Sequence, residues 1–215
     1  MSRFAEDSAT AALFLMASTG GIDTTRVHVI HASLSGHTET LATAIASGAQ
    51  ATGAQVHLTV AEQTQVDEVA QADAIIWGSS GYFGGVNPRM AGFFERLGGL
   101  WLSGGLQGKV GGVFATTSTL HGGLETVLHA LSTAMLHHGM ILVSNSGPLT
   151  PERVRYGCPY GAAAVVETAD NLDLATGQPS TGEMQLAYAF GQRVANVAAA
   201  LSMAGSTREG RPWYG

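Results

Sequence analysis

The stretch RVHVIHASLSGHT, at residues 26–38, decides the fold. Residues 26–32 alternate and are rich in β-branched side chains, which is typical of a β-strand. Residues 33–38 are rich in glycine and hydroxyl groups, and an alanine-rich helical run follows over residues 38–52 and ends near Gly53. Strand, loop and helix in succession are the repeating unit of an α/β protein.

The same unit recurs along the chain. Further strands are predicted at residues 55–60, 73–78, 109–116 and 140–146. Helices are predicted between and after them, at residues 64–71, 88–97, 123–138 and 182–203. The segment DAIIWG at 73–78 is almost wholly apolar, as a central parallel strand buried on both faces should be. We therefore expect an α/β fold with a five-stranded parallel sheet and helices on both faces.

The chain of 215 residues has the length of one domain. We expect that domain at residues 26–203, preceded by an N-terminal extension at 1–25 and followed by a C-terminal tail at 204–215. Residues 147–181 are rich in proline and form too long a stretch for an ordinary connection. We expect this segment to be functional or to lie at a subunit interface.

The composition limits the classes of partner. Hydrophobic residues make up 45% of the chain and charged residues 12%, which favours an oligomer because little charge is left to cover a monomer. The formal net charge is −6 and Lys109 is the single lysine, so nucleic-acid binding is not expected. No apolar run approaches the roughly 20 residues that span a bilayer. Cys158, the single cysteine, cannot form an internal disulfide, which fits a cytoplasmic location; we expect it to be a buried structural residue.

Three loops rich in glycine and hydroxyl groups follow the first, third and fourth predicted strands. They span Ser33–Thr38, Ser79–Gly85 and Thr116–Gly123. Because ligands bind at the carboxyl ends of parallel strands, we expect the three loops to share one site. Hydroxyls, backbone N–H groups and the positive end of a helix can hold a phosphate without a lysine. Neither G-x-x-x-x-G-K-[ST] nor G-x-G-x-x-G occurs, which excludes a P-loop and a Rossmann fingerprint.

Four segments resemble the WrbA family of flavodoxin-like NAD(P)H:quinone oxidoreductases. They are SLSGHTETLA at 33–42, YFG at 82–84 with GGLWLSG at 98–104, LHHGM at 136–140, and PYGA at 159–162. The HHGM and GGLW pieces discriminate best, since flavodoxins at large lack them. The resemblance covers residues 26–203. It implies a flavodoxin-like doubly wound sheet with strand order 2-1-3-4-5, non-covalently bound FMN, and a homotetramer whose sites are completed by neighbouring subunits.

The resemblance also implies the site residues. FMN is expected to contact Ser33, Leu34, Ser35, Gly36, His37, Thr38, Gly81, Tyr82, Phe83, Thr116, Thr117, Ser118, Thr119, His121 and His137. Trp101 and Phe83 would frame the acceptor, with Trp101 exposed in a turn after two glycines, and His137 would hydrogen-bond the flavin's pyrimidine edge. NADH or NADPH would supply two electrons and a quinone-like molecule would accept them. The chain departs from the family at Ser35, where a tyrosine is usual, and at 61–72, where an insertion is missing.

Alternative functions can be weighed against particular residues of the sequence. A flavodoxin-type one-electron carrier is the main one, but residues 79–87 and 115–124 contain none of the acidic side chains that such carriers present. A nitroaromatic or a biosynthetic intermediate is an alternative acceptor, because pocket shape decides the acceptor. The lack of a G-x-S-x-G motif argues against a serine hydrolase. Glu125 and His129 have i, i+4 spacing but lack a third ligand, so no metal site is expected.

Overall fold

The computed structural model describes residues 24–166 and 177–206. The predicted N-terminal extension and the chain beyond residue 206 therefore lie outside the described residues, apart from residues 24 and 25. The strands are β1 (Arg26–Ala32), β2 (Gln55–Val60), β3 (Ala74–Tyr82), β4 (Gly85–Val86), β5 (Val110–Thr117), β6 (Ile141–Leu142) and β7 (Ala162–Val165). The helices are α2 (His37–Gln50), α3 (Val66–Gln71), α4 (Pro88–Arg96), α5 (Gly98–Ser103), α6 (Leu124–His137), α7 (Pro151–Tyr156) and α8 (Thr181–Ser206).

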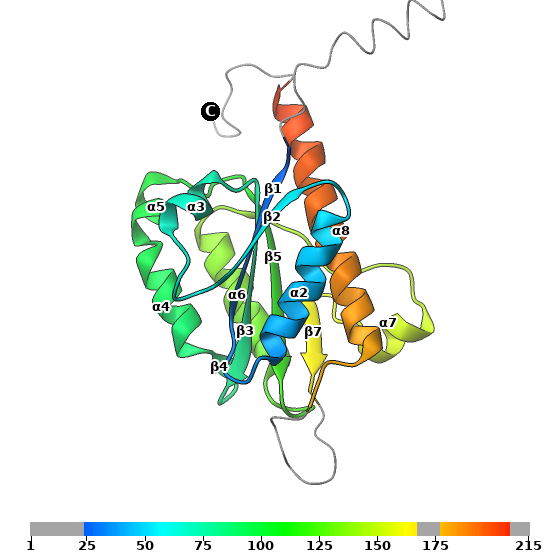
Figure 1. The fold of residues 1–215 in the computed structure, drawn as a ribbon. Coiled ribbons are helices and arrows are strands. Elements are labelled where there is room, and N and C mark those ends of the chain that lie inside the picture. The colour runs from blue at the N-terminus through cyan, green and yellow to red at the C-terminus, as the bar shows by residue number, and fades with distance from the viewer. Residues whose placement is uncertain (1–23, 167–176, 207–215) are drawn as a thin grey trace, which may run out of the picture.

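The strands form one parallel sheet in the order β2-β1-β3-β5-β6. This is the predicted order 2-1-3-4-5, with β1 between β2 and β3 and with all these pairs parallel. The short strand β4 pairs antiparallel with the end of β3 and forms a hairpin there. In Figure 1 the carboxyl ends of β3, β5 and β7 point to the lower edge of the sheet, and the long helix α8 runs along its right side.

The predicted fifth strand, at 140–146, is only partly right. The residues that pair there, in β6, cover just Ile141 and Leu142, which match the start of β5. The second half of β5 pairs instead with β7, from Ala162 to Val165. The edge position is thus shared by two short strands. The segment 147–181, predicted as a long loop, follows β6 and contains helix α7 as well as β7 in its described part.

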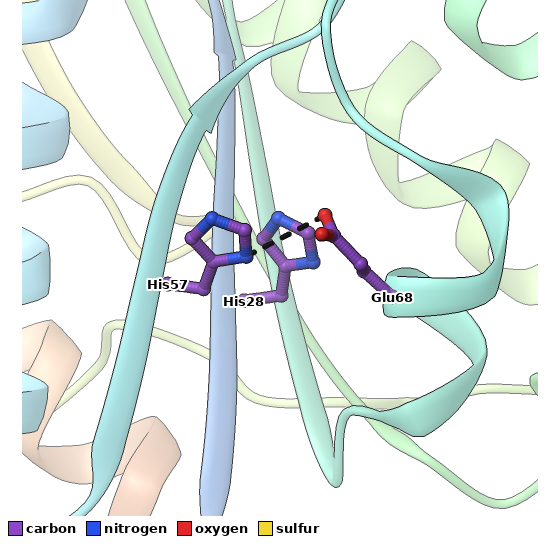
Figure 2. A group of neighbouring side chains, drawn as sticks. All are labelled: His28, His57 and Glu68. Atoms are coloured by element: carbon purple, nitrogen blue, oxygen red, sulfur yellow. Dashed lines mark ion pairs between the residues drawn. The ribbon is translucent and has the colours of Figure 1, made fainter.

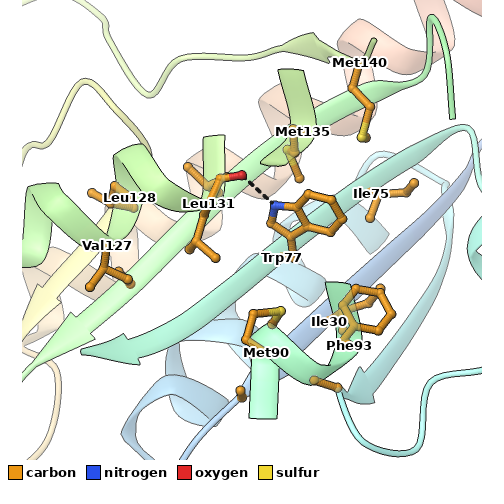
Figure 3. Close-up of a cluster of buried hydrophobic side chains, with 14 of the residues drawn as sticks. Ile30, Ile75, Trp77, Met90, Phe93, Val127, Leu128, Leu131, Met135 and Met140 are labelled. Atoms are coloured by element: carbon orange, nitrogen blue, oxygen red, sulfur yellow. Dashed lines mark hydrogen bonds between the residues drawn. The ribbon is translucent and has the colours of Figure 1, made fainter. Parts of the chain in front are cut away.

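Helices cover both faces of the sheet (Figure 1). Helices α2 and α8 cover one face, where Ile45 and Phe190 join the buried residues of alternate sheet positions. Helices α4 and α6 cover the other face, where Trp77 of β3 is fully buried among Met90, Leu131 and neighbouring side chains. The Trp77 indole N–H donates to the Leu131 carbonyl at 3.3 Å, so its polar group is satisfied inside the apolar core (Figure 3).

Two short helices were not predicted. The segment at 98–103, expected as a turn after Gly98 and Gly99, is helix α5, and none of its residues is buried. Helix α7 begins at Pro151, and Thr150 caps it by accepting from the Arg153 N–H at 3.2 Å. Among the residues that the structure describes, no helix is both long and apolar enough to cross a membrane.

Helices α2 and α8 touch through two glycines. A Cβ atom placed on Gly48 would lie 1.9 Å from the Tyr188 carbonyl oxygen, and one placed on Gly191 would lie 2.0 Å from the Ile45 carbonyl oxygen. Each helix therefore needs a glycine where the backbone of the other one crosses. The contact fixes the position of α2 and, with it, the start of α2 next to the first loop.

We predict that Gly48→Ala destabilises the protein by about 1–3 kcal/mol, because its methyl group must displace the α8 backbone. The matched control is Gly92→Ala in helix α4, where a Cβ atom meets nothing within 4 Å. That substitution should stabilise the protein by about 0.5–1 kcal/mol through its higher helix propensity. Urea unfolding of the two variants measures both signs, and a Gly48→Ala variant as stable as the parent would contradict the packing argument.

Candidate functional site

The three loops meet at the carboxyl edge of the sheet, as predicted. The Thr38 hydroxyl, at the start of α2, lies 2.8 Å from the Thr116 hydroxyl at the end of β5. The second and third loops are in direct contact, because a Cβ atom on Gly123 would lie 2.8 Å from the Gly84 Cα atom. A Cβ atom on Gly81 would likewise lie 2.8 Å from the Thr117 methyl group. The glycines therefore let the three loops close on one another.

The first loop delivers an uncapped helix end. Gly36 adopts a φ of 89°, a left-handed conformation that favours glycine, and its N–H donates to the Ser33 hydroxyl oxygen at 2.9 Å. Helix α2 begins at His37 directly afterwards, and no side chain caps it. The positive end of the helix dipole thus faces the loop. No capping side chain accepts a hydrogen bond from the first backbone N–H groups of the helix.

His37 adds a second feature to this loop. Its ring is buried, and its Nδ1 atom lies 2.9 Å from the Ser35 hydroxyl. The other ring nitrogen, Nε2, is buried and has no hydrogen-bond partner. A buried polar atom without a partner costs free energy, so this nitrogen needs an external acceptor or donor. Ser35 and Leu34 are exposed at the tip of the loop.

The second loop is the β3–β4 hairpin, which carries Gly81, Tyr82 and Phe83. Phe83 has a φ of 49°, which is unusual for a residue other than glycine, and its side chain is 98% exposed. The Tyr82 ring lies next to it at 4.9 Å between centroids. Asn87 fixes the base of the hairpin, because its backbone N–H and its side-chain amide donate to the Ser79 and Ser80 hydroxyls, each at 2.9 Å.

The third loop follows β5. Thr116 and Thr117 are buried at the end of the strand, whereas Ser118, Thr119 and His121 are exposed. The Thr117 hydroxyl donates to the Thr119 carbonyl at 3.0 Å, so the chain turns sharply after the strand. The predicted loop residues of all three segments therefore lie on neighbouring strand ends.

A polar hollow of about 350 Å³ lies beside the first loop and was not predicted. It is lined by Ser33, His31, Arg89 and Glu62, among others. The Arg89 guanidinium donates to the Ser33 carbonyl at 3.3 Å and pairs with Glu62 at 3.1 Å. Burial lowers the pKa of His31, and its Nδ1 atom has no partner. The motif Asn87-Pro88-Arg89 at the start of α4 is the one sequence signal that could have pointed to this arginine.

Trp101 and His137 do not join the loops within this chain. Trp101 lies in α5, which leads to the amino end of β5, and its side chain is 54% exposed. His137 is the last residue of α6 and is also exposed. The chain next to it reaches the same edge, because the Gly108 N–H donates to the Gly139 carbonyl at 2.9 Å. The two residues thus lie at the amino edge of the sheet, opposite the three loops.

The sequence is similar to several named proteins. It is 38% identical over 209 residues to an NAD(P)H dehydrogenase (quinone) of Paracoccus denitrificans, a match that covers 86% of this chain and 99% of that protein. It is 35% identical over 208 residues to a protein of the same name in Geotalea daltonii, with 83% and 99% covered. The family model for NADPH-dependent FMN reductase matches residues 63–152.

Solved structures agree with this similarity. A flavodoxin, WrbA-like protein from Agrobacterium tumefaciens superposes with a TM-score of 0.63 at 26% identity, and the match covers 82% of this chain and 99% of that one. A flavodoxin from the domain Archaea superposes with a TM-score of 0.61 at 20% identity, which shows the flavodoxin-like fold alone. On sequence and fold together, the chain belongs to the WrbA-like, flavodoxin-fold family of NAD(P)H dehydrogenases (quinone).

Proposed function

We propose that this protein binds FMN and transfers two electrons from NADH or NADPH to a quinone-like acceptor. The observation that carries the proposal is the meeting of three loops around an uncapped helix start at the carboxyl edge of the sheet. The names of the relatives support the same reaction. Adding NADH or NADPH to the purified holoprotein under nitrogen should bleach the flavin absorbance, and a quinone should restore it. An unbleached flavin at millimolar nicotinamide would overturn the proposal.

The first loop fits the phosphate of FMN. The backbone N–H groups at the start of α2 are suited to donate hydrogen bonds to an anion, and the segment Ser33 to Thr38 adds hydroxyl groups around them. The buried, unpartnered Nε2 atom of His37 gains a phosphate oxygen as its acceptor if it carries the proton. Gly81, Tyr82 and the segment Thr116–His121 would then lie against the ring system. When bound, FMN supplies the chemistry of accepting a hydride and passing on two electrons.

The protein's own side chains bind and orient the reactants. No Asp or Glu occurs in residues 79–87 or 115–124, so the second and third loops present no negative charge to an anionic nicotinamide nucleotide. The aromatic ring of Phe83 is exposed at the tip of the hairpin, where it can stack on a planar molecule. The lack of acidic side chains gives less support to a one-electron carrier, which docks protein partners through charge.

We further propose a homotetramer in which the amino edge of one subunit completes the loop site of another. Apolar side chains are exposed at both edges: Leu34, Phe83 and Leu120 at the loops, and Trp101, Leu102 and Leu136 at the amino edge. In this arrangement Trp101 would cover the acceptor, and His137 would hydrogen-bond the flavin's pyrimidine edge. We also propose a reducing, cytoplasmic location, because Cys158 is the single cysteine and cannot form an internal disulfide.

We predict that Ser35→Asp weakens FMN binding more than tenfold and leaves riboflavin binding unchanged. The added carboxylate lies in the phosphate loop and repels the phosphate, which riboflavin lacks. Thr43→Asp is the matched control, because Thr43 is exposed on α2 outside the loop and the substitution adds the same charge. Fluorescence titration of the flavin-free protein measures both ligands. Equal losses for FMN and riboflavin would show that the loop does not hold the phosphate.

We predict that Trp101→Ala raises the Michaelis constant for a quinone several-fold while FMN stays bound, and that Trp101→Phe retains most of the affinity. An aromatic plate stacked on the acceptor is worth about 0.5–1.5 kcal/mol. Co-expression of Trp101→Ala with Ser35→Asp should restore sites that combine an intact loop with an intact tryptophan from another subunit. Steady-state kinetics of the mixed assemblies checks this, and no recovery would place Trp101 outside the shared site.

We predict a tetramer by light scattering at micromolar concentration, and smaller species for Leu136→Asp. Leu136 is 60% exposed beside His137, so a charge there would be buried unpaired in the proposed interface. Thr43→Asp, which adds the same charge elsewhere, should remain tetrameric. A parent protein that scatters as a monomer refutes the shared site.

A further inference from the structure

A cluster of ligating side chains lies on the sheet face beside α3, away from the three loops. His28 of β1 and His57 of β2 are direct register partners in the parallel pair, so both side chains project from the same face. Their rings stack at 4.7 Å between centroids with an interplanar angle of 18°. Figure 2 shows the Glu68 carboxylate of α3 beside the His28 ring, with a dashed line that marks its ion pair with His57. Three elements that are distant in sequence thus present two imidazoles and a carboxylate to one point.

The spacing of these groups is close to that of a metal site. The His57 Nδ1 atom and a Glu68 carboxylate oxygen are 3.6 Å apart. One ligand atom from each of His28, His57 and Glu68 lies within 4.8 Å of the others. Ligands about 2.0–2.1 Å from a tetrahedral Zn²⁺ ion are roughly 3.3 Å apart, so side-chain rotation has to bring the three atoms closer by about 1.5 Å at most.

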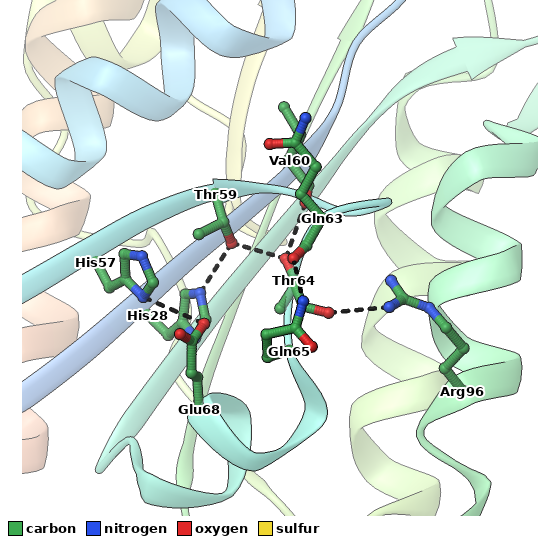
Figure 4. A network of polar contacts seen from close by, with 9 residues as sticks. All are labelled: His28, His57, Thr59, Val60, Gln63, Thr64, Gln65, Glu68 and Arg96. Atoms are coloured by element: carbon green, nitrogen blue, oxygen red, sulfur yellow. Dashed lines mark hydrogen bonds and ion pairs between the residues drawn. The ribbon is translucent and has the colours of Figure 1, made fainter.

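A relay of hydroxyl groups sets the tautomer of His28 (Figure 4). The Thr64 hydroxyl donates to the Val60 carbonyl at 2.9 Å, so its oxygen is left to accept from the Thr59 hydroxyl, 2.7 Å away. The Thr59 oxygen in turn accepts from the His28 Nε2–H at 2.8 Å. With Nε2–H donated to Thr59, Nδ1 is the nitrogen of His28 left for an ion, and the backbone of Glu68 also contacts this ring. Metal-binding histidines are held in this way, by a hydrogen bond from the ring nitrogen that does not bind the ion.

The loop before α3 is fixed as well. Arg96 of α4 donates to the carbonyls of Thr64, at 2.9 Å, and of Ala61. This holds the segment that carries Thr64 and leads into α3, as Figure 4 shows. The His28 ring and its supporting relay are thus placed before any ligand arrives, which lowers the cost of binding.

We propose that His28, His57 and Glu68 form a binding site for a divalent transition-metal ion such as Zn²⁺, with the fourth position open to water. Imidazole and carboxylate ligands suit such ions. A bound ion lies in the plane of each imidazole, so His57 must rotate out of the stack. It is free to do so, because the side chains of His57 and Glu68 are 54% and 44% exposed. They border a hollow of about 270 Å³ that gives an ion access.

The site is independent of the proposed flavin chemistry. Ser33 follows His28 by five positions, which puts the ion about 16 Å from the loop edge along β1. Its effect is structural: the ion ties α3 to β1 and β2 at the edge of the sheet. The residues are not the pair Glu125 and His129 that sequence spacing singles out, and the His129 ring packs on Tyr160 instead.

The test titrates the metal-free, full-length protein, with its flavin bound, with Zn²⁺ by calorimetry. We expect one tight Zn²⁺ per chain in the parent. His57→Ala and Glu68→Gln should each weaken this binding at least tenfold, since each removes one of the three ligands. Both residues are exposed, so these variants should fold where a variant of the buried His28 would be at risk. The matched controls, His129→Ala and Glu95→Gln, remove an exposed histidine and an exposed glutamate elsewhere.

A second measurement is the melting temperature. Because Zn²⁺ binds only the folded chain at this site, it should raise the melting temperature of the parent and of both controls but not that of His57→Ala. No stoichiometric binding in the parent would overturn the proposal. Undiminished binding in His57→Ala and Glu68→Gln would overturn it too, because the ion would then sit on other surface groups.

Discussion

The parallel hydrogen bonding of β1, β3 and β5 is the constraint on which the candidate site depends. Ala32, the last residue of β1, is the register partner of Ser79 in β3, and Ser80 is the partner of Thr116 in β5. The first residues of the three loops are therefore held side by side at the spacing of neighbouring strands, about 4.8 Å. Because these strands are buried on both faces, their register cannot slip without exposing the core. The three loops are therefore held together by the strand register and need no ion pair between them.

The sequence predicted those elements of the fold that local residue patterns determine. The alternation in β1 and the apolar run in β3 are local signals, and they predicted these strands correctly, whereas the strand order was implied by the family resemblance and is confirmed. The shared edge of β5 is not local, since β6 and β7 pair with different halves of one strand. Helix α5 was not predicted, because Gly98 and Gly99 have low helix propensity and tertiary context overrides that preference.

In the candidate site, too, some features follow from local sequence and others only from the folded chain. The three loops could be predicted, because glycine and hydroxyl residues mark the strand ends in the sequence. The contact of Arg89 with Ser33 joins separate segments, and only the folded chain shows it. His28 and His57 look unrelated in sequence, and the β1–β2 register alone makes them neighbours. Glu68 joins them because the short connection from β2 to β3 places α3 over that face. Spacing rules for metal ligands cannot find a site built from three elements.

The separation of the two sheet edges has a consequence for the proposed function. Strand β5 is eight residues long, so its ends are about 23 Å apart, farther than a tryptophan or histidine side chain can reach. If Trp101 and His137 act at the flavin, they must come from another copy of the chain. Both edges expose apolar side chains, and Phe83 holds a strained, fully exposed conformation at the loop edge. Assembly then becomes part of the site itself: a change at the amino edge removes the cover over the acceptor while the FMN loops of the same subunit stay intact.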